Sequence, residues 1–359
     1  MNSEILEDTK LISETDVFEQ NTMNNYFYKY SSIIIIIIVL IISFSSEKNE
    51  TNEIYPNISE KNKSNESYPN ISEKNNSNEN YNNIKVCLCA IGKKENLYAE
   101  EFIDYYIKLG YDKIFIYDNN DKDDERFEDV LQKQIANNFV KIIDYRGYRG
   151  KRNKPQYDSY LDCYKRNSQY CDWLSFFDFD EFLYLKYHKN IKQFLSDKKF
   201  ETCDNIKINW IVYSDNNLVY YDDRKIQERF TEKLLNDADN MHIKSTVRGH
   251  MKINYWSEMN NPHVSRIKVN ACLANGQKVL HEYDSPFHTP PNYDAAYIKH
   301  YATKTIEEFI TKIKRGYSDR KYKVDNKFIQ QRLNYFFAKN KKTKKKLEII
   351  QQLLNYIYK

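Results

Sequence analysis

Three acidic residues interrupt an otherwise apolar run, WLSFFDFDEFLYL, between Trp173 and Leu185. If the run is one extended strand, Asp178 and Asp180 lie on the same side of it, because residues two apart in a strand share a face. Two neighbouring carboxylates raise each other's pKa unless a cation lies between them. Carboxylate oxygens suit Mg²⁺ or Mn²⁺, and two protein carboxylates leave room for substrate phosphate oxygens. We therefore predict a metal site that polarises a diphosphate leaving group.

Three other interpretations of this D-x-D sequence were considered. An aspartyl-phosphate phosphatase has Thr or Val two positions after the second Asp, where this chain has Phe182. A calcium-binding loop alternates acids over a longer run around a central Gly, which this run lacks. The acids could also mark the point where a strand enters solvent. Because the apolar sequence EFLYL resumes at once, we favour a functional role.

The elements that must position these acids alternate between strand and helix. The predicted strands are 84–91, 113–118, 140–145, 173–185 and 206–214. The predicted helices between them are 96–110, 127–136 and 156–170. This alternation predicts an α/β fold, a Rossmann-like, mostly parallel sheet with helices on both faces. Ligands of such sheets bind at the carboxyl ends of the strands, where the second and fourth predicted strands carry acids.

The N-terminal part of the chain has a different composition. A polar tail at 1–30 precedes an apolar segment, and we predict a transmembrane anchor at 31–46, with a cleaved signal peptide as the alternative. Residues 47–83 contain the tandem repeat YPNISEKNKSNES and YPNISEKNNSNEN, which predicts a disordered stalk with N-glycosylation sequons. These segments predict a single-pass membrane protein whose catalytic domain is lumenal or extracytoplasmic.

Charge and cysteine content exclude some classes of protein. The net charge of +4 is spread among mixed acids and bases, so electrostatics gives no case for nucleic-acid binding and we expect no nucleic-acid partner. The six cysteines do not have zinc-site spacing. Their even number permits disulfides, whose connectivity the sequence does not reveal, and buried free thiols fit equally well.

Several longer motifs occur in an order that resembles a known family. They are CAIGKKENLYAEEFIDYYIKLGYDKIFIYDNND, QYDSYLDCYKRN, DWLSFFDFDEFLYL, KSTVR, NPHV and KHYATKTIEEFITKIKRG. The chain resembles glycosyltransferase family 92 and its family-2-like relatives. The resemblance implies a single GT-A domain at 84–320. The sequence KNKKTKKKLEIIQQLLNYIYK, basic and then amphipathic, predicts a helical basic extension at 321–359. The resemblance also implies metal-dependent transfer of a hexose, galactose being one candidate, from a nucleotide-sugar donor such as a UDP-sugar to a glycan hydroxyl, with inversion.

The resemblance assigns roles by position. Asp178 and Asp180 match the metal-binding D-x-D of the family, with Mn²⁺ or Mg²⁺ as the cofactor, and Glu181 matches the acid that follows. The segment Asp118, Asn119 and Asn120 matches residues expected beside the nucleotide. His300 resembles the late histidine that often supplies a third metal ligand in GT-A enzymes, and His263 is the competing residue.

The remaining roles rest on weaker grounds. Asp215 is the candidate catalytic base because it follows the fifth predicted strand, although a structural role in a turn competes strongly. Lys244 and Arg248 are candidates for contacting the donor phosphates, and surface ion pairs would explain them equally well. The chain departs from the family pattern at Lys93 to Glu95. A glycan- or nucleotide-sugar-binding protein that has lost catalysis therefore stays open as an alternative function.

Overall fold

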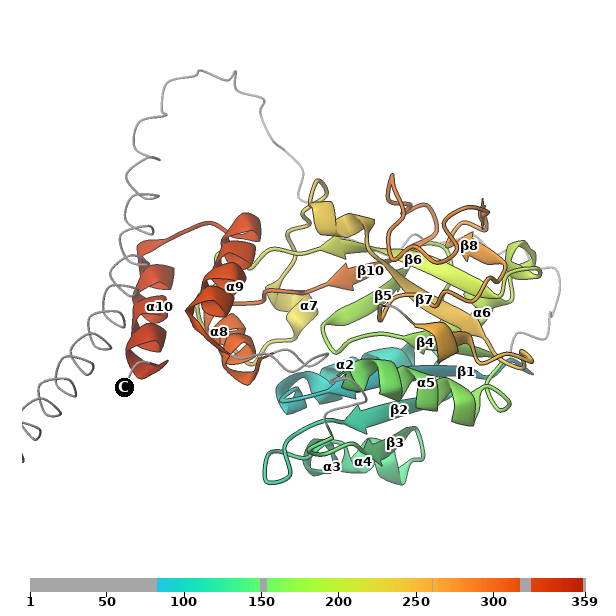
Figure 1. The fold of residues 1–359 in the computed structure, drawn as a ribbon, viewed down its shortest axis with the longest axis horizontal. Helices are drawn as coiled ribbons and strands as arrows, with labels where there is room; N and C mark the ends of the chain where they lie inside the picture. The colour runs from blue at the N-terminus through green and yellow to red at the C-terminus, as the bar shows by residue number, and fades with distance from the viewer. Residues whose placement is uncertain (1–82, 149–153, 260, 317–323, 358–359) are drawn as a thin grey trace, which may run out of the picture. The chain divides into compact units, whose positions relative to one another are not determined.

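A computed structural model describes residues 83–148, 154–259, 261–316 and 324–357 of the chain (Figure 1). In this part of the chain ten strands form one sheet with the order β3-β2-β1-β4-β7-β6-β10-β5, and β8 and β9 extend it beside β6. The strands are β1 (Val86–Gly92), β2 (Lys113–Asp118), β3 (Val140–Asp144), β4 (Trp173–Phe176), β5 (Glu181–Leu185), β6 (Asn205–Val212), β7 (Ile243–Arg248), β8 (Ala271–Leu273), β9 (Lys278–Val279) and β10 (Ala296–His300). Strands β1 to β4 run parallel, as do β6 and β10, whereas β7 and β5 run antiparallel to their neighbours.

Helices flank this sheet, so the predicted α/β fold is confirmed. The α-helices are α2 (Asn96–Lys108), α3 (Phe127–Val130), α4 (Gln132–Ala136), α5 (Pro155–Asn167), α6 (Ile191–Leu195), α7 (Ile226–Arg229), α8 (Ile306–Arg315), α9 (Asn326–Lys339) and α10 (Lys344–Ile357). Helices α8, α9 and α10, coloured orange to red, lie together at one end of the sheet (Figure 1).

Strand β1 is buried on both faces and separates two hydrophobic cores. Its alternate side chains point to opposite sides, so Leu88 packs in one core with Phe102 of α2, and Cys89 packs in the other with Tyr160 of α5. A strand covered on both faces reads as a continuous apolar run, which is what VCLCAIG shows. The two helices therefore fix the central strands from both sides.

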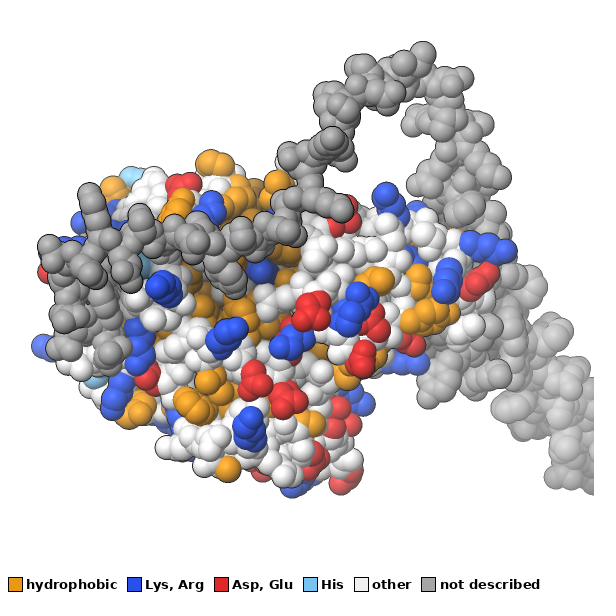
Figure 2. Space-filling model, turned by 180° about the vertical axis from the view of Figure 1, so that it is seen from behind, with side chains coloured by type: hydrophobic (Ala, Val, Ile, Leu, Met, Phe, Trp, Pro, Cys, Tyr) orange, Lys and Arg blue, Asp and Glu red, His pale blue; other side chains and the backbone are white. Residues whose placement is uncertain are grey.

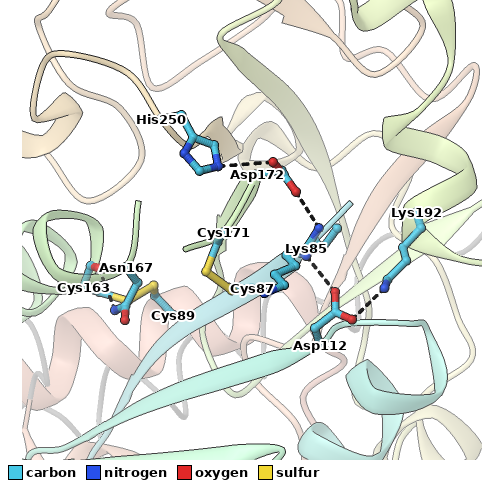
Figure 3. The surroundings of a disulfide bond; sticks show 11 residues. Lys85, Cys87, Cys89, Asp112, Cys163, Asn167, Cys171, Asp172, Lys192 and His250 are labelled. Atoms are coloured by element: carbon cyan, nitrogen blue, oxygen red, sulfur yellow. Dashed lines mark hydrogen bonds and ion pairs between the residues drawn. A yellow bond between two sulfur atoms is a disulfide. The ribbon is translucent and has the colours of Figure 1, made fainter. Parts of the chain in front are cut away.

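All six cysteines form disulfides, which resolves the alternative that the sequence left open. Cys87 pairs with Cys171 and Cys89 with Cys163, so two bonds join β1 to α5 and to the residues just before β4 (Figure 3). The third bond joins Cys203, before β6, to Cys272 of β8. Each bond closes a loop of roughly seventy residues or more, for which chain entropy predicts about 4 kcal/mol of stabilisation.

The run 173–185 is not one strand, which corrects the sequence prediction. Strand β4 ends at Phe176, a turn follows, and β5 pairs with β10 at the far edge of the sheet. The turn is closed by the Glu181 N–H, which donates to the Asp178 carbonyl at 3.0 Å. Phe179 is buried in the core, with its ring centroid 5.1 Å from that of Phe127. Burial of this phenylalanine in a turn explains why the apolar pattern continues through the acids.

The helices of the structure contradict the prediction of a single-pass membrane protein with a lumenal domain. Across the residues that the structure describes, no helix combines the length and apolar character that crossing a membrane requires. The predicted anchor at 31–46 and the predicted stalk at 47–83, apart from its last residue, lie outside the described residues.

Charged side chains of both signs are interspersed with apolar ones on the face opposite that of Figure 1 (Figure 2). This mixture agrees with the small net charge of +4.

Candidate functional site

The carboxyl ends of the parallel strands all lie at the same end of the sheet, which is called the carboxyl edge from here on. Strand β7 runs antiparallel to β4 and β6 and therefore begins at this same edge. The edge gathers Asp118 at the end of β2, the turn 177–180 after β4, Lys244 near the start of β7 and His300 at the end of β10. Most of the residues singled out from the sequence are thus brought together, as the rule for ligands of open α/β sheets predicts.

Asp178 is held by residues of β7 and α5. Lys244 Nζ donates to Asp178 Oδ2 at 2.8 Å. Gln156 Nε2 and the Tyr160 hydroxyl donate to Oδ1 at 2.8 and 3.2 Å. The Asp178 side chain is nevertheless 34% exposed, whereas that of Lys244 is only 1% exposed. Asp178 is therefore fixed in direction by buried donors and still open to a ligand.

Lys244 also binds Glu181, at 3.3 Å from Oε2. Burial raises the pKa of the Glu181 carboxyl well above its ordinary value, and Lys244 opposes this effect only in part. Burial alone would lower the pKa of Lys244, but Asp178 and Glu181 raise it, so the ammonium stays charged. Lys244, the predicted phosphate contact, thus lies on the buried side of Asp178 and Glu181, where its positive charge compensates theirs.

Asp180 faces in a different direction and is contacted by α8. Lys312 Nζ donates to Asp180 Oδ2 at 2.7 Å, and His300 Nε2 lies 3.8 Å from Oδ1. Burial alone raises the pKa of Asp180, but the nearby cations, Lys312 first among them, hold it well below its usual range. Asp180 is therefore ionised. Sequence analysis missed Lys312, because no local pattern shows that the second turn of this helix faces the acids.

The donor set at Asp180 fits a divalent cation that is shared with a substrate. Among the described residues no group of three His, Cys, Asp or Glu side chains is arranged to hold a metal ion. Asp180 Oδ1 and His300 Nε2 nevertheless face each other, and burial lowers the pKa of His300 to about 4, which leaves its lone pair free. Mg²⁺ is usually bound through one or two carboxylates and completes its shell with water and substrate phosphate. Asp180 with the open Asp178 beside it would meet this need, and His300 would add a nitrogen ligand.

The segment after β2 forms a rigid loop around an arginine. Asp118 is buried and pairs with Arg146 at 3.0 Å. The same guanidinium donates to the carbonyls of Asp121, Lys122, Asp124 and Glu125. Two buried atoms in this segment, Asn119 Oδ1 and Asn120 Nδ2, have no hydrogen-bond partner among the described residues. Arg146, which sequence analysis also missed, therefore fixes the loop that carries these buried amides.

Arg248 is not brought to this edge. It pairs in register with Trp173, the first residue of β4, and so lies at the opposite end of the strands from the acids. Its guanidinium stacks over the Trp173 ring at 4.3 Å and donates to the carbonyls of Phe200 and Cys203. The structure therefore places Arg248 in the framework of the sheet, away from the acids.

Asp215 follows β6 but is buried in an ion pair. Its side chain and that of Lys346, on α10, are 2% and 0% exposed and bind each other. Asp215 Oδ1 also accepts from the Asn217 N–H at 2.9 Å, in a turn. Burial raises the pKa of Asp215, while Lys346 opposes the shift. This geometry favours the structural alternative over the predicted catalytic base.

Three histidines surround Trp210 beside the acids. The His300 ring centroid lies 4.0 Å from that of Trp210, His242 is stacked on the indole at 4.7 Å, and His263 lies at 5.3 Å. Trp210 Nε1 and His300 Nδ1 are buried without a hydrogen-bond partner in the described residues. Sequence analysis weighed His300 and His263 but missed His242, which carries no motif of its own.

Comparisons with known proteins agree with the sequence resemblance. The model of glycosyltransferase family 92 matches residues 82–348. A family 92 protein of Arabidopsis thaliana is 29% identical over 111 residues, which are 30% of this chain and 17% of that protein. A family 92 protein of Oryza sativa subsp. japonica is 27% identical over 110 residues, 31% of this chain and 18% of that protein. The chain thus matches less than a fifth of the length of these relatives.

The crystal structure of S. aureus TarS superposes with a TM-score of 0.32 and 11% identity, over 71% of this chain and 43% of that chain.

Proposed function

Because the chain belongs to glycosyltransferase family 92, we propose that it transfers a sugar from a nucleotide-sugar donor to a hydroxyl of a glycan acceptor, with inversion at the anomeric carbon. The observation that carries this proposal is the turn after β4, which places Asp178 and Asp180 at the carboxyl ends of the strands of an α/β sheet. The sheet and its flanking helices support a GT-A type of fold. A hexose, galactose being one candidate, is the group that we propose is transferred.

Asp180 and His300 would hold Mn²⁺ or Mg²⁺, with Asp178 beside them on the open side of the turn. When bound, such an ion neutralises the charge that develops on the departing diphosphate. Lys244 binds Asp178 and Glu181 from their buried side, and Lys312 supplies a further positive charge at Asp180. The charged groups that interact with the diphosphate are thus already in place before the reaction. A preorganised site of this kind lowers the activation barrier because its groups need not rearrange in the transition state.

The donor nucleoside would bind at the end of β2. Asn119 Oδ1 can only accept a hydrogen bond and Asn120 Nδ2 can only donate one, and neither has a partner in the described residues. A uracil ring offers the complementary pair, an N–H donor beside a carbonyl acceptor. This complementarity supports a UDP-sugar as the donor.

The experiment that tests the proposal measures sugar transfer and donor hydrolysis by the full chain with a panel of UDP-hexoses, with and without Mn²⁺. We expect turnover that EDTA abolishes and Mn²⁺ restores, and a rise in melting temperature when Mn²⁺ and UDP are added. Asp180→Asn should lose both effects, whereas Asp222→Asn, at an exposed acid paired with Arg224, should keep both. Donor binding without turnover would instead support the sugar-binding alternative, and neither binding nor turnover would refute the proposal.

A further inference from the structure

His242 lies at the entrance to β7, on the edge where the acids gather. Its ring is stacked on Trp210 at 4.7 Å with an interplanar angle of 23°, and the ring of Phe287 lies 4.6 Å away on an edge-on approach. Phe287 is 44% exposed, whereas Trp210 is buried. The imidazole therefore packs between the rings of Trp210 and Phe287. The Phe287 ring faces solvent and offers a surface against which a sugar ring can lie.

The tautomer of His242 follows from its hydrogen bond. Nδ1 lies 3.0 Å from the carbonyl oxygen of Asp239, which can only accept, so Nδ1 carries the hydrogen. Nε2 of the neutral ring then holds a lone pair. A histidine whose Nδ1–H is fixed by a carbonyl has the orientation and tautomer of a general base.

The position of His242 relative to the acids follows from the backbone. His242 is extended, with φ −61° and ψ 148°, and leads directly into β7. Residues two apart in extended backbone project to the same side, so His242 and Lys244 share a side of the chain. Since Lys244 Nζ binds Asp178, the imidazole lies on the same side of β7 as the proposed diphosphate site.

The other candidates for a base are each committed to another contact. Glu181 is fully buried against Lys244. Asp215 is paired with Lys346. His300 faces Asp180. His263 Nδ1 likewise lies 2.7 Å from a carbonyl oxygen, that of Ile243, but burial together with Lys244 lowers its pKa well below the ordinary value, which makes it a weaker base than His242.

Resting on the proposed function, we propose that His242 is the catalytic base that accepts the proton of the acceptor hydroxyl at Nε2. As the O–H bond breaks, the acceptor oxygen forms a bond to the anomeric carbon of the donor sugar. The bond from that carbon to the phosphate oxygen breaks, and its electron pair leaves with the nucleoside diphosphate. The protonated imidazole returns its proton to water after the product leaves.

The surroundings of His242 suit this role. Burial is the main cause that lowers its pKa, and the ammonium groups of Lys244 and Lys339 lower it further, so the ring is neutral near pH 7. The Asp239 carboxylate acts in the opposite direction, although it is itself paired with Lys339 at 3.0 Å. The neighbouring His263 ring, 5.4 Å away between centroids, has its own pKa lowered by burial and adds no charge.

The test compares His242→Ala and His242→Gln with the wild-type full chain in sugar transfer, using a UDP-hexose that the wild type turns over. We expect kcat for transfer to fall by roughly 10²–10⁴-fold while the KM for the donor stays unchanged, since a general base contributes about this factor. Added imidazole should restore part of the rate of the Ala variant. The acidic limb of the wild-type pH profile of kcat/KM should be missing from both variants.

The matched control is His250→Asn. His250 is 50% exposed in its side chain and pairs with Asp172, just before β4, at the opposite end of the strands. Its φ of 56° is one that Asn tolerates, so the control should fold and transfer sugar like the wild type. Melting temperatures of both His242 variants would show whether they fold.

Three outcomes would overturn the inference. Transfer by folded His242 variants at the wild-type rate would refute it alone. Loss and imidazole rescue in His263→Ala, but not in His242→Ala, would assign the base to His263. Absence of wild-type turnover with every donor would refute the proposed function and this inference with it.

Discussion

The buried pair of Asp215 and Lys346 gives the clearest separation between a structural and a catalytic carboxylate. Asp215→Ala leaves the Lys346 ammonium fully buried without its partner, and breaking a buried pair on one side costs about 3–5 kcal/mol. In the double variant Asp215→Leu/Lys346→Met neither charge remains. Replacing a buried ion pair with apolar residues of similar volume is often neutral, so most of this loss should be recovered.

The assay combines urea unfolding at pH 7 with sugar transfer by the same preparations. If Asp215 is structural, the single variant should show a lower free energy of unfolding, and the double variant should regain both stability and transfer. Lys346→Met alone should destabilise the protein as Asp215→Ala does, because it leaves the buried carboxylate unpaired. A double variant that unfolds like the wild type yet transfers no sugar would refute this reasoning and return Asp215 to the role of base.

Two further predictions concern the framework of the site. In Gly92→Ala, the new Cβ would lie 2.5 Å from the Phe127 ring and 2.7 Å from the Phe179 ring. This overpacking should lower the free energy of unfolding in urea by about 1–3 kcal/mol, and it should weaken UDP binding because it displaces the turn. An unchanged free energy of unfolding together with unchanged UDP binding would contradict this. In Glu308→Gln, the buried pair with Arg229 is broken at a cost of about 3 kcal/mol at pH 7. Burial alone raises the pKa of Glu308, but Arg229 lowers it below its ordinary value, so the stabilisation is present above about pH 4 and lost at lower pH. The difference in unfolding free energy between wild type and variant should therefore shrink from pH 7 to pH 3, and a constant difference would contradict the assignment.

The regular elements were predictable because their hydrophobic patterns are local. The predicted strand 113–118 matches β2, and the predicted helix 96–110 corresponds to α2 followed by Gly110, whose φ of 99° suits a helix end. The helix N-terminus at Thr305 was also predictable, since Glu308 completes a capping box. In each case the sequence pattern that predicts the element lies within a few neighbouring residues.

The turn after β4 shows where local patterns stop being informative. Phe179 is apolar for the same reason as the strand residues before it, namely burial, so hydrophobicity alone cannot distinguish a strand from a buried turn. The consequence for the site is large. In a single strand the two acids would share a face, whereas in the turn Asp178 binds Lys244 and Asp180 binds Lys312, which are residues of different elements.

The partners of the acids could not be found from the sequence, because they come from distant parts of the chain. Lys312 lies 132 residues from Asp180, and Lys244 lies 66 residues from Asp178. Lysines on a helix ordinarily face solvent, so nothing in the sequence separates Lys312 from its exposed neighbours, and Lys244 was predicted to contact phosphate rather than Asp178. His242 was missed for a related reason, since its role depends on the tertiary stacking of Trp210 and Phe287 around it.

The C-terminal helices belong to the structure that holds the candidate site. On α8, Lys312 binds Asp180, and one turn later Arg315 pairs at 2.5 Å with Glu95, in the loop between β1 and α2. The end of β1 and the turn after β4 are thus tied to the same helix. A change that moves α8 would shift both segments together.

Helix α10 extends this coupling to the end of β6. Lys346 reaches Asp215 there, and Asn340 accepts a hydrogen bond from the Asp215 backbone N–H at 2.7 Å. A carboxylate as deeply buried as Asp215 needs a cation, and the chain before α8 supplies none at this position in the described residues. Lys346 of the basic C-terminal segment therefore completes the fold at the end of β6 by pairing with a buried acid.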